Sequence, residues 1–266
     1  MVEPRRIELT EAQASKASRT YWNSAAAEYL AEHGDFLGDD RFVWCPEGVD
    51  EADAQLLGNV RGKSILEVGC GAGQCTRWLT AQGAQAVAFD ISVEQLQVSR
   101  TLDRKTGTTA RAVAADATAI PFADATFDIA CSAFGALPFV ADAGTVLREI
   151  ARALKPGGLL VFSVTHPFRW SMPDDPSPHG LRIIHSYFDR TPYVEVDAGT
   201  PIYAEYHRTV GDWIRDLTEA GFVVDDLLEP EWPAGHTGVW GGWGPERGQY
   251  VPGTAIWSAH KRVVAG

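Results

Sequence analysis

Short apolar runs alternate with longer amphipathic stretches through the middle of this chain. Three runs, Ile65–Val68, Ala86–Asp90 and Ala112–Ala115, have the length of buried strands, and Asp128–Cys131 has the same character. Helical patterns fill the gaps between them. Strands that alternate with helices form right-handed βαβ units and a parallel sheet. The pattern from 65 to 164 therefore predicts an α/β fold with a Rossmann-like, doubly wound sheet.

The regions on either side of this core have other patterns. Residues 11–33 are rich in alanine and place aromatic residues on a helical stripe, which predicts a helix that ends at Gly34. A second helix is expected over residues 50–57. From 166 to 209 the rhythm breaks: prolines cluster, and 183–189, 193–196 and 202–206 are expected to be strands. Thr209 or Asp212 is expected to cap the following helix, and the last two strands are expected over 222–228 and 254–259.

We expect one domain with four parts. These parts are an N-terminal helical lid (1–60), the core (61–165), a β-rich cap insertion (166–209), and a C-terminal helix with two final strands (210–266).

A glycine-rich loop follows the first core strand. Gly69, Cys70, Gly71 and Gly73 lie in this loop, and a helix begins near Gln74. Glycines let the backbone turn sharply and approach a ligand closely, and the free N–H groups of the helix start then face that ligand. The loop predicts a site for a nucleotide-type cofactor.

Three details point away from NAD: the spacing of the glycines, Glu67 and Asp90. The G-x-G-x-G spacing differs from the G-x-G-x-x-G fingerprint, and Glu67 stands where it would repel a phosphate but suit a cationic ligand. Asp90 ends the next strand, 21 residues after Gly69, where a carboxylate can accept both ribose hydroxyls. Asp116 follows the third strand and is placed to accept from an adenine amino group.

Taken together, these motifs resemble the class I S-adenosylmethionine-dependent methyltransferases, and within them the small-molecule, type 11-like enzymes. The resemblance extends to Ile120–Phe122, Phe127–Ala130, the segment LREIARALKPGGLL at Leu147–Leu160, and Leu217–Phe222. It implies a seven-stranded, mostly parallel sheet with an antiparallel edge hairpin. It also implies S-adenosylmethionine as cofactor, S-adenosylhomocysteine as product, and no metal.

The resemblance extends the cofactor site beyond the loop and the acids. It implies that the Ala117 backbone N–H binds adenine, that Ile91 packs on the adenine face, and that Ser132 lines the methionine arm. Tyr21 and Tyr29 are expected to help the N-terminal helix close over the cofactor. The segment CSAFG lacks the Asn/Asp-Pro-Pro-Tyr/Phe motif of enzymes that methylate bases or amides, which counts against those substrates.

Methyl transfer from a sulfonium is an in-line displacement that rests mainly on positioning, with a weak base where the nucleophile is a hydroxyl. Histidines are the candidates for that base. We expect His166 first, because it directly follows the fifth strand, and His236 second, because it lies in a glycine- and tryptophan-rich loop. A structural role is the alternative for each histidine. The six tryptophans outside the sheet are either loop anchors or an aromatic wall for the substrate: Trp22, Trp44, Trp170, Trp232, Trp240 and Trp243.

The composition indicates which class of partner to expect. The net charge is −12, with 35 acidic against 23 basic residues, which disfavours nucleic-acid binding. No apolar run approaches a membrane span and no secretory signal is visible, so we expect a cytoplasmic monomer or homodimer with reduced cysteines. The favoured function is methylation of a small molecule at oxygen or nitrogen.

Three alternatives stay open. An enzyme of the same fold could act on protein or RNA, and a basic groove of Arg169, Arg182, Arg190 and Arg208 would favour that function. A regulator could bind the cofactor without transferring methyl. The third alternative is an enzyme that binds NAD or another nucleotide.

Overall fold

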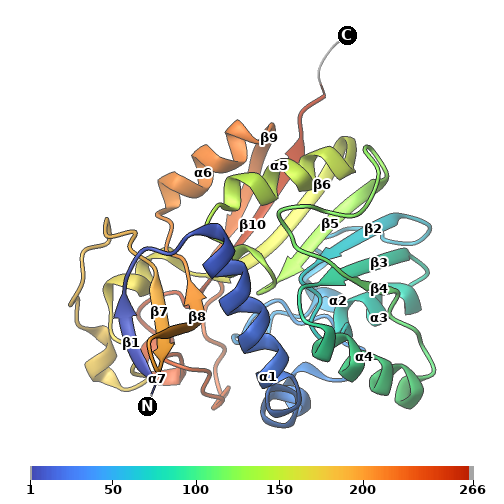
Figure 1. The fold of residues 1–266 in the computed structure, drawn as a ribbon. Coiled ribbons are helices and arrows are strands. Elements are labelled where there is room, and N and C mark those ends of the chain that lie inside the picture. The colour runs from blue at the N-terminus through green and yellow to red at the C-terminus, as the bar shows by residue number, and fades with distance from the viewer. Residues whose placement is uncertain (1, 264–266) are drawn as a thin grey trace.

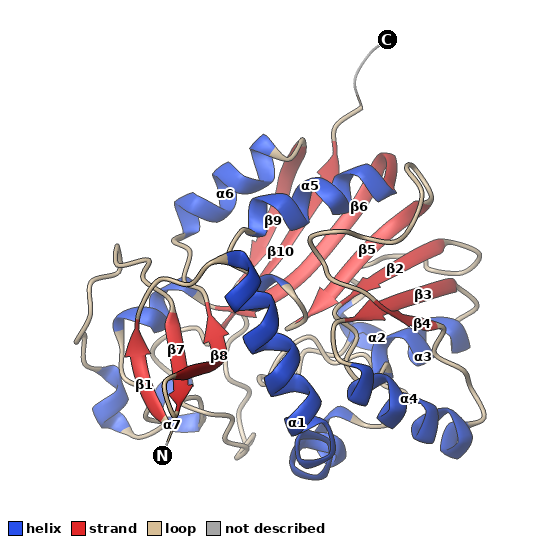
Figure 2. Ribbon diagram, viewed as in Figure 1, coloured by secondary structure: helices blue, strands red, loops and turns tan. Residues whose placement is uncertain are grey.

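A seven-stranded sheet forms the centre of the computed structural model, which describes residues 2–263 (Figure 1; Figure 2). The strand order is β4-β3-β2-β5-β6-β10-β9. The first five strands of this order are parallel, and β10 runs antiparallel to both β6 and β9. The Rossmann-like class and the antiparallel edge predicted from the sequence are confirmed. The strand bounds are β2 Ser64–Val68, β3 Gln85–Asp90, β4 Ala112–Ala114, β5 Phe127–Ala133, β6 Leu154–Thr165, β9 Phe222–Leu228 and β10 Thr254–Lys261.

A second sheet of three antiparallel strands lies beside the first (Figure 1). Its order is β1-β7-β8, with bounds Glu3–Arg6, Tyr193–Asp197 and Thr200–Glu205. The sequence predicted β7 and β8 but gave no sign of β1. The N-terminus therefore joins the cap insertion through backbone hydrogen bonds, with Glu3 opposite Val196 and Arg6 opposite Tyr193.

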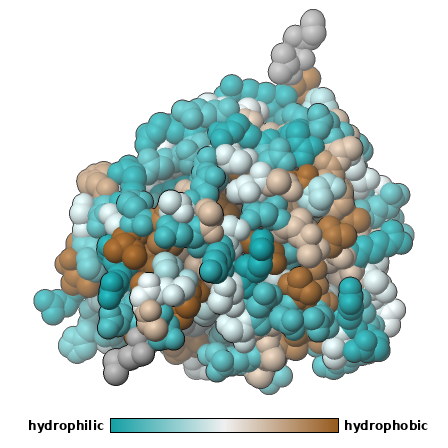
Figure 3. All heavy atoms as spheres, viewed as in Figure 1, coloured by the Kyte–Doolittle hydropathy of each residue, from teal (hydrophilic) through white to brown (hydrophobic). Residues whose placement is uncertain are grey.

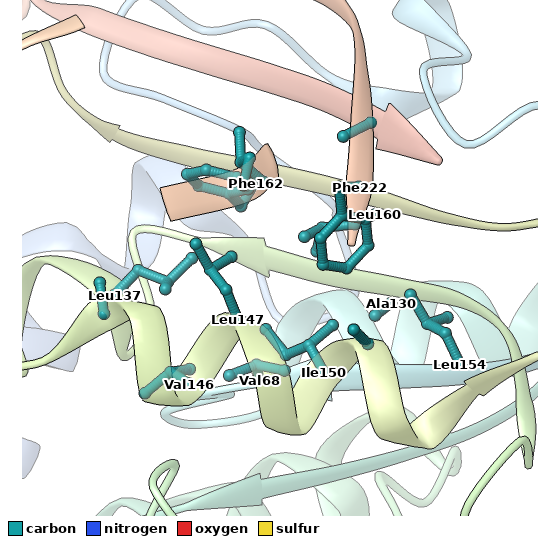
Figure 4. Packing of buried hydrophobic residues seen from close by; sticks show 14 of the residues in the cluster. Val68, Ala130, Leu137, Val146, Leu147, Ile150, Leu154, Leu160, Phe162 and Phe222 are labelled. Carbon is teal, nitrogen blue, oxygen red and sulfur yellow. The ribbon is translucent and has the colours of Figure 1, made fainter. Parts of the chain in front are cut away.

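Helices cover both faces of the large sheet. Their bounds are α1 Glu11–Leu37, α2 Glu51–Ala54, α3 Gln74–Ala81, α4 Val93–Thr106, α5 Ala143–Ala153, α6 Val210–Glu219 and α7 Pro245–Gly248, with 3-10 turns η1 Leu137–Phe139, η2 Pro167–Ser171 and η3 Pro178–Leu181. One core cluster packs α5 and α6 on the sheet, and Figure 4 shows Leu147 and Ile150 of α5 facing Leu160 and Phe162 of β6. A second cluster packs α3 and the segment 42–60 on the other face.

The two clusters follow from the two-residue period of the strands. Ile129 belongs to the α3 cluster and its neighbour Ala130 to the α5 cluster, and Val161 and Phe162 divide in the same way. All four side chains are buried. Strands buried on both faces have continuous apolar runs, which is why the core strands could be recognised in the sequence.

Helix boundaries differ from the prediction in two places. The first helix does not end at Gly34 but continues to Leu37, where Gly38, at φ 71°, donates its N–H to the Gly34 carbonyl. The predicted helix over 50–57 is a single turn, α2, because Gln55 takes a left-handed conformation after it. Thr209 and Asp212, offered as alternative caps, act together as a capping box at the start of α6.

One predicted strand in the cap is wrong. Residues 183–189 form a loop, although Ile183 and Phe188 gave them strand-like hydrophobicity. Those two side chains are 67% and 71% exposed, so no apolar face holds the segment in a sheet. Tyr187 anchors the loop instead: its hydroxyl accepts the N–H of Val210, and its carbonyl oxygen lies 2.7 Å from Nε2 of His207.

Figure 3 shows a face on which hydrophilic residues predominate, with hydrophobic ones scattered between them. Among the described helices, even the 27-residue α1 has no stretch apolar enough to cross a bilayer.

The buried guanidinium of Arg247 connects two loops, the one between η2 and η3 and the one that precedes α7. Arg247 is fully buried, and its Nη1 donates to the carbonyl oxygens of Pro173 at 2.8 Å and Gly242 at 3.0 Å. A third bond reaches the Asp175 carbonyl, and the guanidinium lies 4.1 Å from the Trp243 ring centroid. These carbonyls have few alternative partners away from water, so the loops depend on one side chain.

We predict that Arg247→Met lowers the free energy of unfolding by about 3 kcal/mol, because it leaves buried carbonyls without donors. Urea denaturation followed by circular dichroism measures the change. Arg100→Met, at an exposed position on α4, is the matched control and should change stability by less than about 0.5 kcal/mol. Equal effects of the two substitutions would contradict the role of Arg247.

Candidate active site

A cavity of about 1040 Å³ lies at the carboxyl edge of the parallel strands. Its lining includes the loop after β2, the ends of β3 and β5, the segment 115–118, α1, and parts of the cap. Ligands of open α/β sheets bind at this edge. The cavity is therefore the candidate active site, with one end at the glycine loop and the other under the cap.

The glycine loop is held by contacts that exclude a side chain. Gly69 has φ 70°, and a Cβ on it would lie 2.5 Å from the backbone nitrogen of Ala136. Gly73, at φ 75°, caps α3 and packs against Ser99 and Ala110, where a Cβ would lie within 2.8 Å of each. Backbone packing thus brings the loop after β2 against the loop after β5.

Asp90 fixes the loop from the end of β3. One carboxylate oxygen accepts the N–H of Gly71 and the other accepts the N–H of Ser92, each at 2.8 Å. Burial raises the pKa of Asp90 above its usual value, and the backbone donors partly oppose that shift. Each oxygen keeps a lone pair toward the cavity, as the predicted ribose contact requires.

Glu67 is a buried carboxyl whose hydrogen bonds offset only part of the cost of its burial. Burial raises its pKa to about 7, and hydrogen bonds from Thr76 oppose the shift. The Thr76 hydroxyl donates to its Oε2. The side chain lies beneath the glycine loop and lines the cavity, so a cation bound there would favour its ionised form.

Asp116 ties the N-terminal helix to the sheet edge. Its Oδ2 accepts the hydroxyl of Ser15 on α1 at 2.7 Å, and its Oδ1 accepts both donors of Thr118. Burial raises the pKa of Asp116, but these hydrogen bonds outweigh it and the net shift is downward. Near the middle of α1, Asn23 accepts the hydroxyl of Ser92 at 2.8 Å. The helix thus closes the adenosine end.

The cavity gathers most of the residues predicted to contact the cofactor. Those on its lining are Glu67, Gly69, Cys70, Gly71, Gln74, Asp90, Ile91, Asp116, Ala117, Tyr21 and Tyr29. Two predicted residues are not on it. Gly73 packs against Ser99, and Ser132 turns its hydroxyl to the Val68 carbonyl at 2.7 Å. Both hold the wall behind the site.

The two predicted base candidates do not line the cavity. Nδ1 of His166 accepts the N–H of Phe168, and its Nε2 lies 2.8 Å from Glu229. His236 stacks on Trp232 and its Nε2 lies 2.9 Å from the Pro46 carbonyl. Their ring nitrogens are engaged in loop contacts, so the geometry gives a base role for either histidine no support. His33 and His185, which the sequence analysis did not single out, do line the cavity.

The far end carries residues that the sequence analysis also missed. Tyr193 and Glu195 of β7 stand opposite Glu205 and Tyr203 of β8, respectively, and all four side chains line the cavity. Tyr193 donates to Glu195 at 3.1 Å and Tyr203 donates to Glu205 at 3.0 Å. The only sequence signal was a tyrosine two residues before a glutamate on each of two strands.

The tryptophans fill both expected roles. Five of the six line the cavity and Trp232 does not, which gives the aromatic wall Trp22, Trp44, Trp170, Trp240 and Trp243. Trp240 stacks on His33, with ring centroids 3.7 Å apart. Trp232 acts as a loop anchor, since its indole N–H donates to the His236 carbonyl at 2.8 Å.

We predict a pH-dependent stability from Glu67. Its pKa is about 4.5 in an unfolded chain and about 7 when folded, so the folded state holds a proton that unfolding releases between these values. The stabilisation that protonated Glu67 contributes to the folded state is therefore complete below about pH 4.5 and is lost as the pH rises through 7. The free energy of unfolding of Glu67→Gln, measured relative to that of wild type, should therefore rise by about 2 kcal/mol from pH 5 to pH 8.

Urea denaturation at both pH values measures this double difference. Glu231→Gln, in an exposed loop, is the control and should show no such gain. A Glu67→Gln variant whose stability follows wild type at both pH values would contradict the prediction.

The family model and curated relatives that this chain matches are methyltransferases. The family model described as "Methyltransferase domain" matches residues 66–162. A demethylmenaquinone methyltransferase of Mycobacterium sp. (strain JLS) is 40% identical over 125 residues, which are 47% of this chain and 49% of that enzyme. The matched part spans about half the length, or less, of such curated relatives.

Solved structures extend the likeness over the chain. An S-adenosylmethionine dependent methyltransferase of Mesorhizobium loti has a TM-score of 0.63 and 26% identity, covering 79% of this chain and 96% of that one. The 1,6-didemethyltoxoflavin-N1-methyltransferase of Burkholderia thailandensis has the same fold over 98% of this chain and 95% of its own, with a TM-score of 0.63 and 18% identity. The matching family model thus assigns residues 66–162 to a methyltransferase domain, and solved S-adenosylmethionine-dependent methyltransferases share the fold over most of the chain.

Proposed function

We propose that this protein transfers the methyl group of S-adenosylmethionine to a small molecule at nitrogen or oxygen. The observation that carries the proposal is one continuous cavity that extends from the glycine loop to a chamber under the cap. Its volume is in the range of small-molecule sites. The cap and α1 cover the approach, which suits a small acceptor better than a macromolecule.

The residues present fit the cofactor. Asp90 would accept the ribose hydroxyls, the segment 115–118 would meet adenine, and Glu67 with the glycine loop would face the methionine end. When bound, S-adenosylmethionine supplies an electrophilic methyl on a sulfonium. The side chains then have to orient the acceptor in line with that methyl and exclude water.

The basic groove that would favour an RNA or protein substrate has little support. Arg169 pairs with Asp174 at 2.7 Å, Arg190 pairs with Asp212 at 2.7 Å, and Arg208 lies 3.5 Å from Asp216. Phosphate binding needs cations that are free to replace counterions. Three of the four arginines that were expected to form the groove are thus paired, the exception being Arg182, which favours the small-molecule hypothesis.

Calorimetry with S-adenosylhomocysteine tests the cofactor. We expect Asp90→Ala to raise the dissociation constant at least tenfold, because it removes the ribose acceptor and the anchor of Gly71. Asp226→Ala, exposed on β9, should bind as wild type does. Tight binding of NAD with no response to S-adenosylhomocysteine would overturn the proposal. If S-adenosylhomocysteine does bind, an assay with labelled methyl donor against a metabolite panel would identify the acceptor.

We also predict that cofactor binding releases protons. The ammonium and sulfonium charges of S-adenosylmethionine should lower the pKa of Glu67 from about 7, releasing about half a proton at pH 7. Calorimetry in two buffers of different ionisation enthalpy measures this release. Glu67→Gln should abolish it, whereas the same release from wild type and variant would exclude Glu67 as the source.

A further inference from the structure

The face of β7 and β8 that lines the cavity has an alternating pattern of tyrosine and glutamate. Tyr193 and Glu195 alternate along β7, and opposite them Glu205 and Tyr203 alternate along β8. Side chains two apart on a strand, and side chains of directly paired residues, share one face of a sheet. We call these four residues the Tyr–Glu face. The opposite face of the same sheet is apolar, with Val194, Val196 and Ala204 buried in a separate cluster.

Each glutamate of the Tyr–Glu face lacks a cationic partner. Among the described residues, no lysine or arginine side chain lies within 4 Å of the carboxylate of Glu195 or Glu205. Arg6 and Arg169 interact electrostatically with Glu205 without forming an ion pair with it, and Nη2 of Arg169 bonds to Asp174. The carboxylates accept tyrosine hydroxyls instead, and lone pairs stay free on both.

Each arginine on the cavity lining forms at least one ion pair or hydrogen bond, although Nε of Arg169 has no partner. Arg5 pairs with Glu3, Arg41 pairs with Asp50, and Arg6 donates to the Thr191 carbonyl. Together with the paired Arg169, these are all the arginines on the described lining. Apart from the Arg5–Glu3 pair, the lining near the Tyr–Glu face has three carboxylates, Asp174, Glu195 and Glu205, against two arginines, Arg6 and Arg169, so this end has a surplus of negative charge.

Aromatic rings continue the Tyr–Glu face across to α1. The rings of Tyr21 and Tyr203 have centroids 4.6 Å apart, and Tyr21 packs edge-on against Trp22 at 5.1 Å. Phe139 joins the group through Trp22 and Tyr203. Aromatic faces attract organic cations, and the attraction grows when water is excluded. Carboxylates within an aromatic wall suit an ammonium group on an apolar body.

Glu205 lies closest to the reacting edge of the sheet. Thr165, the last residue of β6, donates its hydroxyl to Oε1 of Glu205 at 3.1 Å. The neighbouring strand, β5, ends at Ala133, which lines the same cavity beside the glycine loop. Glu205 is thus held above the carboxyl edge, on the far side of the cavity from the adenosine acids.

We propose that the acceptor is an amine on an aromatic or apolar body, held by the Tyr–Glu face with its nitrogen toward Glu205. This inference rests on the proposed function and names its substrate class. The ammonium gives one proton to the Glu205 carboxylate, and the nitrogen lone pair forms the N–C bond. The C–S bond breaks with its electron pair going to sulfur, which leaves S-adenosylhomocysteine and a methylated ammonium, and Glu205 returns its proton to water.

The test uses three probes of one shape and different charge. Phenethylamine, 2-phenylethanol and phenylacetate are titrated into the intact protein saturated with S-adenosylhomocysteine. We expect phenethylamine to bind at least tenfold more tightly than either of the others. Equal binding, or preference for the alcohol or the acid, overturns the inference. This ranking needs no variant, so it decides the question even if a variant fails to fold.

Two variants then localise the effect. Glu205→Gln should reduce the preference for phenethylamine to less than threefold while the affinity for S-adenosylhomocysteine stays within twofold of wild type. Glu219→Gln, at the exposed end of α6, should keep the full preference. An unchanged preference in Glu205→Gln overturns the role of Glu205. If wild type binds no S-adenosylhomocysteine, the proposed function fails, whereas binding without amine preference overturns only this inference.

Discussion

The contact between two backbone turns is the constraint on which the cavity depends. A Cβ on Gly69 would meet the Ala136 nitrogen at 2.5 Å, and a Cβ on Gly135 would meet the Val68 carbonyl at 2.2 Å. Between these turns Phe134 takes a left-handed conformation, with φ 49°, and its N–H donates to Ser163. Such strain in a non-glycine residue persists only where the surrounding structure enforces it. The two turns bring the loops after β2 and β5 together as the cavity floor.

Carboxylates that form no ion pair with a described lysine or arginine line both ends of this floor, buried at the cofactor end and half-buried at the acceptor end. Glu67 and Asp90 have raised pKa values at the cofactor end, where burial outweighs their hydrogen bonds. At the other end, burial and Glu195 raise the pKa of Tyr193 to about 12, so its phenol stays a neutral donor. Burying a charge without its partner is unfavourable. Both ends are therefore complementary to cations, a sulfonium nucleoside on one side and an ammonium on the other.

The sequence could place most of the predicted cofactor residues on one cavity because they lie in local, contiguous elements. Strand, glycine loop and helix are contiguous, and Asp90 and Asp116 each follow a strand whose position was clear from its apolar run. The acceptor end could not be predicted in the same way. The Tyr–Glu face depends on the β7–β8 register, and Tyr21 reaches it from a helix some 180 residues earlier in the chain.

The same difference, between local sequence and contacts made in the folded chain, explains why His166 was expected at the cavity but does not line it. His166 follows β6 directly, so its position in the sequence suggested the cavity mouth. What position could not indicate is the partner of each ring nitrogen: the Phe168 N–H and the Glu229 carboxylate hold His166 in the wall. β1 was missed for a related reason, since its four residues are mostly exposed and become a strand only by pairing with β7.

Helix α1 completes both ends of the cavity at once. Ser15 bonds to Asp116 at the adenosine end, and Tyr21 packs on Tyr203 at the acceptor end, less than two helical turns away. A rigid helix cannot withdraw from Asp116 without also moving Tyr21 away from the Tyr–Glu face. The wall of the predicted adenosine end and the aromatic wall of the acceptor chamber therefore depend on the same helix.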